Sequence, residues 1–345
     1  MRRQSWINVV AIACVLTGAL LIVARNVEGG TSPRLLNVSY DPTRELYDRL
    51  NRAFVESYRQ RTGREVQIRQ SHGGSSHQAR TVASGEQVAD VVTLGLFPDI
   101  DSLRKRGLLA ANWAERLPCH SHPYTSTIVF VVRKGNPRQI HDWPDLIRAG
   151  VEVVTPNPRS SGNGKLSVLA AWGAVVTRGG NDAEALAYLR QLFAHTAAMD
   201  AGARGAAITF AVQEVGDVHL TWENEAIREV AEAKGRLELI YPPVSILAEP
   251  VVAWVDANVA RHHTGADARA YLEYLFSDEA QAIIAELGYR PVSPTVAARQ
   301  AATLPPITLF AVTALAHDWD DAQQRFFAEN GIVDTALDSQ PGWTR

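Results

Sequence analysis

The stretch LLNVSYDPTRE, residues 35–45, sets the fold class and the first element of a candidate site. It is an apolar, strand-like run that ends on Asp41 and Pro42. Asp is a favoured N-cap residue and Pro suits the first helical position, so a helix is predicted to begin here with Asp41 as its cap. The N–H groups of its first turn have no acceptor within the helix and point back towards the end of the strand.

Two further stretches repeat this construction. SHGGSSHQA (71–79) has two glycines before a pair of serines, and TPNPRSSGNGK (155–165) has two prolines before a second pair. Each predicts a strand, a tight turn and a helix N-terminus, where free N–H donors and the helix dipole together favour an anion. Three such ends in one chain indicate a protein that holds a small oxyanion.

Apolar runs alternate with amphipathic helical segments along the chain, which predicts an α/β fold with parallel-rich sheets flanked by helices. We expect lobe I at 33–125 plus 248–312, lobe II at 126–247, and a C-terminal helix and tail at 313–345. Ligands of open α/β sheets bind beyond the carboxyl ends of the strands, where the three helix starts fall. A cleft between the lobes is therefore the predicted site.

Two crossover strands are expected to join the lobes. One is the β-branched run at 124–134, and the other is SILAEPVVAWVD (245–256), which returns the chain to lobe I. Helices are predicted near 268–287 and 318–329. The tail from Asp334, which contains Gly, Pro and Ser, is predicted to be mobile.

The formal net charge of −3 provides no basic excess to neutralise phosphates, so a nucleic-acid partner is not expected. Residues 1–30 read as an export signal, with Arg2 and Arg3 before an uncharged run at 6–24. This run is either cleaved or, being long enough to span a bilayer, retained as an anchor. Both alternatives predict a periplasmic protein, tethered to the membrane in the second case.

Cysteine and histidine provide no metal pattern. Cys119 is the only cysteine outside the export signal, which excludes an internal disulfide if the signal is removed. The pairs His72 and His77, and His120 and His122, fit no zinc spacing. We expect no metal, no cofactor and a monomer.

Eight motifs carry a resemblance to a known family: LLNVSYDPTREL, QSHGGSS, PYTSTIVFVVRKGNPRQIHDW, TPNPRSSGNG, LAAWG, GARG, TWENEA and ILAEP. In this order and spacing, over roughly residues 34 to 330, the chain resembles the periplasmic sulfate-binding proteins of sulfate and thiosulfate import systems. The resemblance implies the type II periplasmic binding-protein fold. It also implies capture of sulfate or thiosulfate in the cleft, delivery to a membrane ABC permease, and no enzymatic activity.

The resemblance also implies a set of sulfate contacts. These are the backbone N–H groups of Asp41, Ser75, Gly162, Asn163 and Ala203, the hydroxyl of Ser161 and the indole N–H of Trp222. Arg204 is expected to pair with a carboxylate and orient its loop. Sulfate is a dianion that only accepts hydrogen bonds, while amide and indole N–H groups only donate, so the chemistry agrees.

The family pattern has Gly-Gly where this chain has Gly162-Asn163. Since the donor is the backbone, we expect Asn to be compatible there, and the change could tune the preference between sulfate and thiosulfate. Replacing the side chains of Ser75 or Asn163 is expected to cost less binding than Trp222→Phe or Ser161→Ala.

Three other ligands and one enzymatic activity remain as alternatives beside this interpretation. Phosphate carries a proton near neutral pH and needs an acceptor carboxylate, which none of the implied contacts supplies. Molybdate has the charge of sulfate but longer bonds, and thiosulfate is nearly isosteric. His72-Gly73-Gly74 resembles the oxyanion hole of serine esterases, but the chain contains no Gly-x-Ser-x-Gly elbow, so no catalytic residue is assigned.

Overall fold

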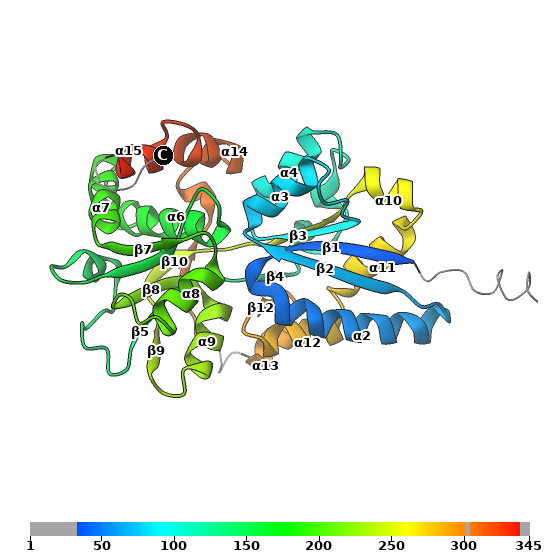
Figure 1. Ribbon diagram of the computed structural model, residues 1–345, viewed down its shortest axis with the longest axis horizontal. Coiled ribbons are helices and arrows are strands. Elements are labelled where there is room, and N and C mark those ends of the chain that lie inside the picture. Colours follow the sequence, from blue (N-terminus) through cyan, green and yellow to red (C-terminus); the bar gives the residue numbers. More distant parts are fainter. Residues whose placement is uncertain (1–32, 301–303, 339–345) are drawn as a thin grey trace, which may run out of the picture.

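The computed structural model describes residues 33–300 and 304–338, which form two α/β lobes joined near the middle of the molecule (Figure 1). The predicted export signal lies outside this range. Among the described residues, no helix combines the length and the apolar character needed to cross a membrane.

Lobe I is built on a four-stranded sheet of order β11-β3-β1-β2. The first three strands of the chain are parallel to each other and the fourth is antiparallel to β3: β1 Arg34–Tyr40, β2 Gln67–Gly73, β3 Val91–Leu94 and β11 Val251–Trp254. The helices of this lobe are α2 Arg44–Thr62, α3 Ser75–Ala83, α4 Phe97–Lys105, α10 Asp256–His262, α11 Gly265–Tyr274, α12 Asp278–Glu286 and α13 Pro294–Gln300. The predicted helix at 268–287 is therefore two helices, interrupted between Tyr274 and Asp278.

Lobe II is built on a five-stranded sheet of order β7-β6-β8-β5-β9. Its strands are β5 Ile128–Arg133, β6 Val153–Pro156, β7 Thr196–Asp200, β8 Val218–Trp222 and β9 Leu237–Ile240. Strand β6 is parallel to β7 and β8, whereas β5 is antiparallel to β8 and β9. The helices are α6 Gly162–Val176, α7 Asp182–Ala194, α8 Ala203–Ala211 and α9 Glu223–Glu232.

Each predicted crossover strand is interrupted where it passes between the lobes. The first is divided into β4 Tyr124–Thr125 and β5, and the second into β10 Val244–Ile246 and β11. At the crossing, Ser126 and Ala248 exchange two backbone hydrogen bonds of 2.9 Å. Two crossing segments thus join the lobes as expected, and each is divided where the bonding partners of its residues change.

The chain also crosses a third time, between β12 Arg290–Pro291, which pairs with β4, and β13 Thr308–Phe310, which pairs with β10. The segment that follows contains α14 Trp319–Ala322, a π-helical turn at Gln323–Phe327 and α15 Ile332–Leu337. Its apolar side chains, including Phe310, Phe326 and Val333, join the buried cluster around Trp172 of α6. Residues 308–312 thus pack with lobe II, although the sequence assigned them to lobe I.

The prediction of a mobile tail from Asp334 was wrong for its first four residues. They complete α15, because Val333, Ala336 and Leu337 are buried against the core of lobe II. The remaining short elements are the 3-10 turns Asp41–Thr43, Trp113–Glu115, Trp143–Ile147 and Val312–Ala314, and α5 Pro118–Ser121.

Candidate functional site

The N-termini of α3 and α6 meet where lobe I faces lobe II. A Cβ on Gly162, the first residue of α6, would lie 3.3 Å from the Cβ of Ser75, the first residue of α3. A Cβ on Gly74 would lie only 2.6 Å from the carbonyl oxygen of Ser160, so no side chain fits there. Gly74, directly before the serine pair, therefore allows the two lobes to approach each other closely here.

The first turns of α3, α6 and α8 carry N–H groups with no acceptor in their own helices. The first backbone bonds onto the cap residues are Gln78 N to Gly74 O, Lys165 N to Ser161 O and Ala206 N to Gly202 O, at 2.9, 3.1 and 3.2 Å. The amides before these, including those of Ser75, Gly162, Asn163 and Ala203, are left without an intrahelical partner. All four residues are buried, so these donors are also largely shielded from water.

Asp41 does not cap a helix, contrary to the prediction. The chain begins a 3-10 turn at Asp41 itself, Tyr40 precedes that turn, and no side chain caps it. The Asp41 carboxylate instead accepts a 3.1 Å hydrogen bond from Arg44 Nη2. It also reaches lobe II, since a Cβ on Gly202 would lie 2.6 Å from its Oδ2. The one-residue shift follows from the tight 3-10 start, which draws Asp41 into the turn.

Ser75 carries a structural role that its sequence position did not reveal. Its hydroxyl donates to Asp99 Oδ2 at 2.5 Å and accepts from the amide of Gly95 at 3.0 Å, while Ser76 donates to Asp99 Oδ1 at 2.8 Å. Asp99 lies in the first turn of α4 and is buried. Sequence reasoning missed it, because a first-turn acid usually indicates only a favourable charge at the helix dipole.

Ser161 and Trp222 supply two buried side-chain donors that no described residue uses. Ser161 occupies the N-cap position of α6 but makes no capping bond, and its hydroxyl bonds to no described residue. Trp222 ends β8, is 1% exposed, and packs its ring against Tyr40 with a centroid distance of 5.4 Å. Its Nε1–H likewise has no acceptor within the described part of the chain. Both residues are buried, but the Ser161 hydroxyl and the Trp222 Nε1–H are not sealed from solvent, so these two groups are available for an external acceptor.

The side chain of Asn163 is hydrogen-bonded within the protein, which the sequence did not predict. Its Oδ1 accepts from the amide of Trp222 at 3.1 Å, and its Nδ2 donates to Leu220 O at 3.1 Å and to Ser167 Oγ at 3.2 Å. Asn163 therefore contributes more than a backbone N–H to this region.

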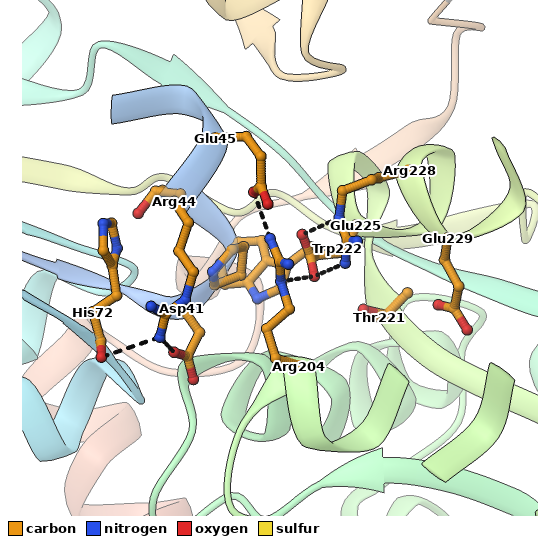
Figure 2. A network of polar contacts seen from close by, with 12 residues as sticks. Asp41, Arg44, Glu45, His72, Arg204, Thr221, Trp222, Glu225, Arg228 and Glu229 are labelled. Carbon is orange, nitrogen blue, oxygen red and sulfur yellow. Dashed lines mark hydrogen bonds and ion pairs between the residues drawn. The ribbon is translucent and has the colours of Figure 1, made fainter. Parts of the chain in front are cut away.

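Arg204 links the two lobes beside the site (Figure 2). It follows Ala203 in α8 and donates through Nη2 to Glu45 of α2 in lobe I, while its Nε lies 3.0 Å from Glu225 Oε2 in lobe II. Burial alone would raise the pKa of Glu45, but the hydrogen bond from Arg204 lowers it below its ordinary value. Burial raises the pKa of Glu225, an effect that Arg228 and Arg204 partly oppose. Arg204 thus pairs with one carboxylate on each lobe.

In the part of the chain that the structure describes, neither a metal cluster nor a nucleophile with its base lies near these residues. Within residues 33–300 and 304–338, no group of three or more His, Cys, Asp and Glu side chains could hold a metal ion. The hydroxyl of Ser75 bonds to Asp99, and that of Ser161 to no histidine of the described chain. His72 instead contacts Gln70, and burial lowers its pKa.

Comparison with known proteins identifies a matching family and several relatives of similar sequence. Residues 36–290 match the family described as bacterial extracellular solute-binding protein. The sulfate-binding protein of Salmonella typhimurium is 47% identical over 93% of this chain and 96% of its own length. The thiosulfate-binding protein of Pseudomonas aeruginosa is 43% identical over 92% of this chain and 97% of its own.

Solved structures extend this likeness to the fold. The sulfate-binding protein SubI from Mycobacterium tuberculosis superposes with a TM-score of 0.78 and 32% identity, over 86% of this chain and 99% of SubI. A periplasmic thiamin-binding protein, 18% identical with a TM-score of 0.65, shares the fold alone. Both matches cover 86% of this chain, so the likeness extends over both lobes.

Proposed function

Because the chain belongs to the family of bacterial extracellular solute-binding proteins, and its relatives at 40–47% identity bind sulfate or thiosulfate, we propose that it captures sulfate between its lobes. It holds the anion outside the cytoplasmic membrane and delivers it to an ABC permease. It catalyses no reaction of its own and acts as a monomer. Thiosulfate, which is nearly isosteric with sulfate, is the second candidate ligand.

The observation that carries this proposal is the pair of unused side-chain donors, on the buried residues Ser161 and Trp222, beside free helix N-termini. The proposed contacts are the amides of Asp41, Ser75, Gly162, Asn163 and Ala203, the Ser161 hydroxyl and the Trp222 indole N–H. Sulfate remains a dianion at neutral pH and only accepts hydrogen bonds, so a donor set of amides, one hydroxyl and one indole suits it. Helix dipoles stabilise the desolvated charge without a facing Arg or Lys.

The arrangement of carboxylates supports sulfate over phosphate. A phosphate bearing a proton needs an acceptor in the site. Asp99, the buried carboxylate behind Ser75, already accepts from two serine hydroxyls, and Asp41 pairs with Arg44. Both oxygens of Asp99 and Oδ1 of Asp41 thus already have protein donors, and Asp99 is turned towards the serines of α3.

One calorimetric series tests the proposal. The purified protein is titrated separately with sulfate, thiosulfate, phosphate and molybdate at pH 7. We expect sulfate to bind and phosphate to bind at least a hundredfold more weakly. The proposal fails if sulfate does not bind, or if phosphate or molybdate binds more tightly. A sulfate affinity below that for thiosulfate would move the assignment to the second ligand.

A further inference from the structure

We propose that the side chain of Asn163 positions the indole of Trp222 for the anion, acting as a substitute strand partner at the end of β8. This inference rests on the proposed function, because it assumes that the Trp222 Nε1–H donates to the bound ligand. It assigns to Asn163 a role that its backbone N–H cannot fill.

The argument begins with the hydrogen-bond ladder of β8. On one side, β5 pairs with the whole strand, up to Ile128 opposite Trp222. On the other side, β6 pairs only with the first two residues, ending at Val154 opposite His219. On the β6 side, the last three residues of β8 therefore have no strand partner, although this stretch is buried.

Asn163 fills the missing positions of that ladder. Its Oδ1 accepts from the amide of Trp222, and its Nδ2 donates to the carbonyl of Leu220, both at 3.1 Å. These are an amide and a carbonyl two residues apart on one strand, which is the pair of groups that a neighbouring strand would bond. Because the Trp222 amide only donates and the Leu220 carbonyl only accepts, the orientation of the Asn163 amide is fixed.

The two hydrogen bonds from the Asn163 side chain to Leu220 and Trp222, which we call the Asn163 clamp, couple two parts of the candidate site. Asn163 is the second residue of α6, next to Ser161 and Gly162, and it is 1% exposed. Its side chain ties the first turn of this helix to the backbone of Trp222, so the amide donors and the indole donor are held as one unit. Without the clamp, the Leu220 carbonyl and the Trp222 amide lose their partners, and the residue carrying the indole loses its support on that side.

Glycine at position 163 would keep the backbone donor and remove the clamp. Sulfate affinity is measured by calorimetry for the parent, Asn163→Gly, Trp222→Phe and the double variant. If Asn163 acts through the indole, Asn163→Gly alone should weaken binding about tenfold, and less than twofold in the Trp222→Phe background. Ser167→Ala is the matched control, since it removes a bond that the Asn163 amide makes within α6 and leaves the bonds to β8 untouched. It should stay within about twofold of the parent.

Equal losses in the two backgrounds would overturn the proposal, as would an Asn163→Gly protein that binds like the parent. Circular dichroism checks that each variant folds, and Asn163→Ala replaces Asn163→Gly in the same cycle if the glycine variant does not. A parent protein that fails to bind sulfate would refute the proposed function. A parent that binds, with an additive cycle, would refute only the role of Asn163.

Discussion

Ser161 stands at the N-cap position of α6 without acting as a cap. A serine in this place usually accepts a hydrogen bond from an amide of the first turn. Here the backbone is extended, with φ −119° and ψ 132°, and the hydroxyl makes no such bond. The first-turn amides of α6 are therefore left free, and the hydroxyl adds one more donor beside them. A serine at this position normally bonds to the first-turn amides of its helix, but Ser161 leaves these amides free to bind an anion.

Ser161→Ala should weaken sulfate binding by roughly 1.5–3 kcal/mol, about ten- to a hundredfold, because a hydrogen bond to a charged ligand is lost in a closed cleft. The free energy of unfolding without ligand should stay within about 0.5 kcal/mol, since no internal bond is removed. Calorimetry and urea denaturation measure the two quantities. Ser160→Ala is the comparison, because the Ser160 hydroxyl donates to Ala201 O at 2.8 Å. Undiminished affinity in Ser161→Ala would remove this hydroxyl from the site.

At the residue scale, the sequence predicts the groups that donate hydrogen bonds to the anion better than it predicts the side chains that hold those groups in place. Gly-Gly and Pro-x-x-Ser patterns are local, so the three helix starts could be placed from neighbouring residues. The bonds from Asn163 to Leu220 and Trp222 span 57 and 59 residues, and that from Ser75 to Asp99 spans 24. These partners meet only through the sheet topology. The predicted capping role of Asp41 failed for a local reason, since the chain starts with a 3-10 turn that includes Asp41 itself.

Helices α3 and α4 are joined at their N-terminal ends through Asp99. Both carboxylate oxygens accept from serines of α3, and the Ser75 hydroxyl also accepts from Gly95 just before α4. The free amides of α3 are thus fixed in place by a contact with a second helix. Such a buried, fully paired carboxylate contributes to the rigidity of the site as well as to its stability.

Ser75→Ala should lower the free energy of unfolding by about 1.5–3 kcal/mol, because it leaves a buried carboxylate oxygen and the Gly95 amide unpaired. The sequence alone gave no reason to expect this loss, since it assigned Ser75 only a backbone contact. Urea denaturation of the ligand-free protein measures it. Ser102→Ala on α4, whose hydroxyl bonds to the carbonyl of Asp99, provides the control and should cost about 1 kcal/mol or less. Equal stability of Ser75→Ala and the parent would contradict the inferred role of Asp99.

Elements with a clear local pattern lie where the sequence predicts them: the helices that follow the two serine pairs begin at Ser75 (α3) and Gly162 (α6). The crossover strands differ because Ser126 and Ala248 bond to each other across the boundary between the lobes. Apolar character continues through both interruptions, so hydrophobic periodicity alone cannot reveal them.

On the scale of the whole molecule, contacts between the lobes extend well beyond the candidate site. Arg204 reaches Glu45, and Lys105 of α4 bonds to Asp320 of α14 at 2.6 Å, where these helices face each other in the upper part of Figure 1. The second contact exists because the C-terminal segment packs on lobe II. The sequence predicted two lobes from the order of strands and helices. It did not place this segment, because β13 and α15 are too short to be recognised without their tertiary partners.

The ion pair between Arg204 and Glu45, which we call the Arg204 bridge, is expected to contribute slightly to closure of the two lobes. This contribution should depend on pH in a defined direction. The Glu45 side chain is 49% exposed, so Glu45→Gln should weaken sulfate binding by at most about 1 kcal/mol, roughly fivefold, at pH 7. Arg204 lowers the pKa of Glu45 in the closed form, so its contribution is complete above the ordinary value of 4.5 and is lost as the pH falls through the lowered pKa. Sulfate affinity should therefore stay nearly constant between about pH 5 and 8, since none of the proposed donors titrates there. Below about pH 4.5 the parent should approach Glu45→Gln.

Calorimetric titrations at pH 7, 5 and 4 follow this convergence, with Glu65→Gln as the control. Glu65 is also exposed but has no ion pair among the described residues, so its replacement should leave affinity unchanged at every pH. Small-angle scattering with and without sulfate separates closure of the lobes from direct contact with the ligand. Glu45→Gln should need more sulfate than the parent to reach the compact form. Once reached, that form should have the same radius of gyration as the compact form of the parent. Equal affinities of Glu45→Gln and the parent at pH 7 would mean that the bridge forms as a consequence of closure and does not favour it.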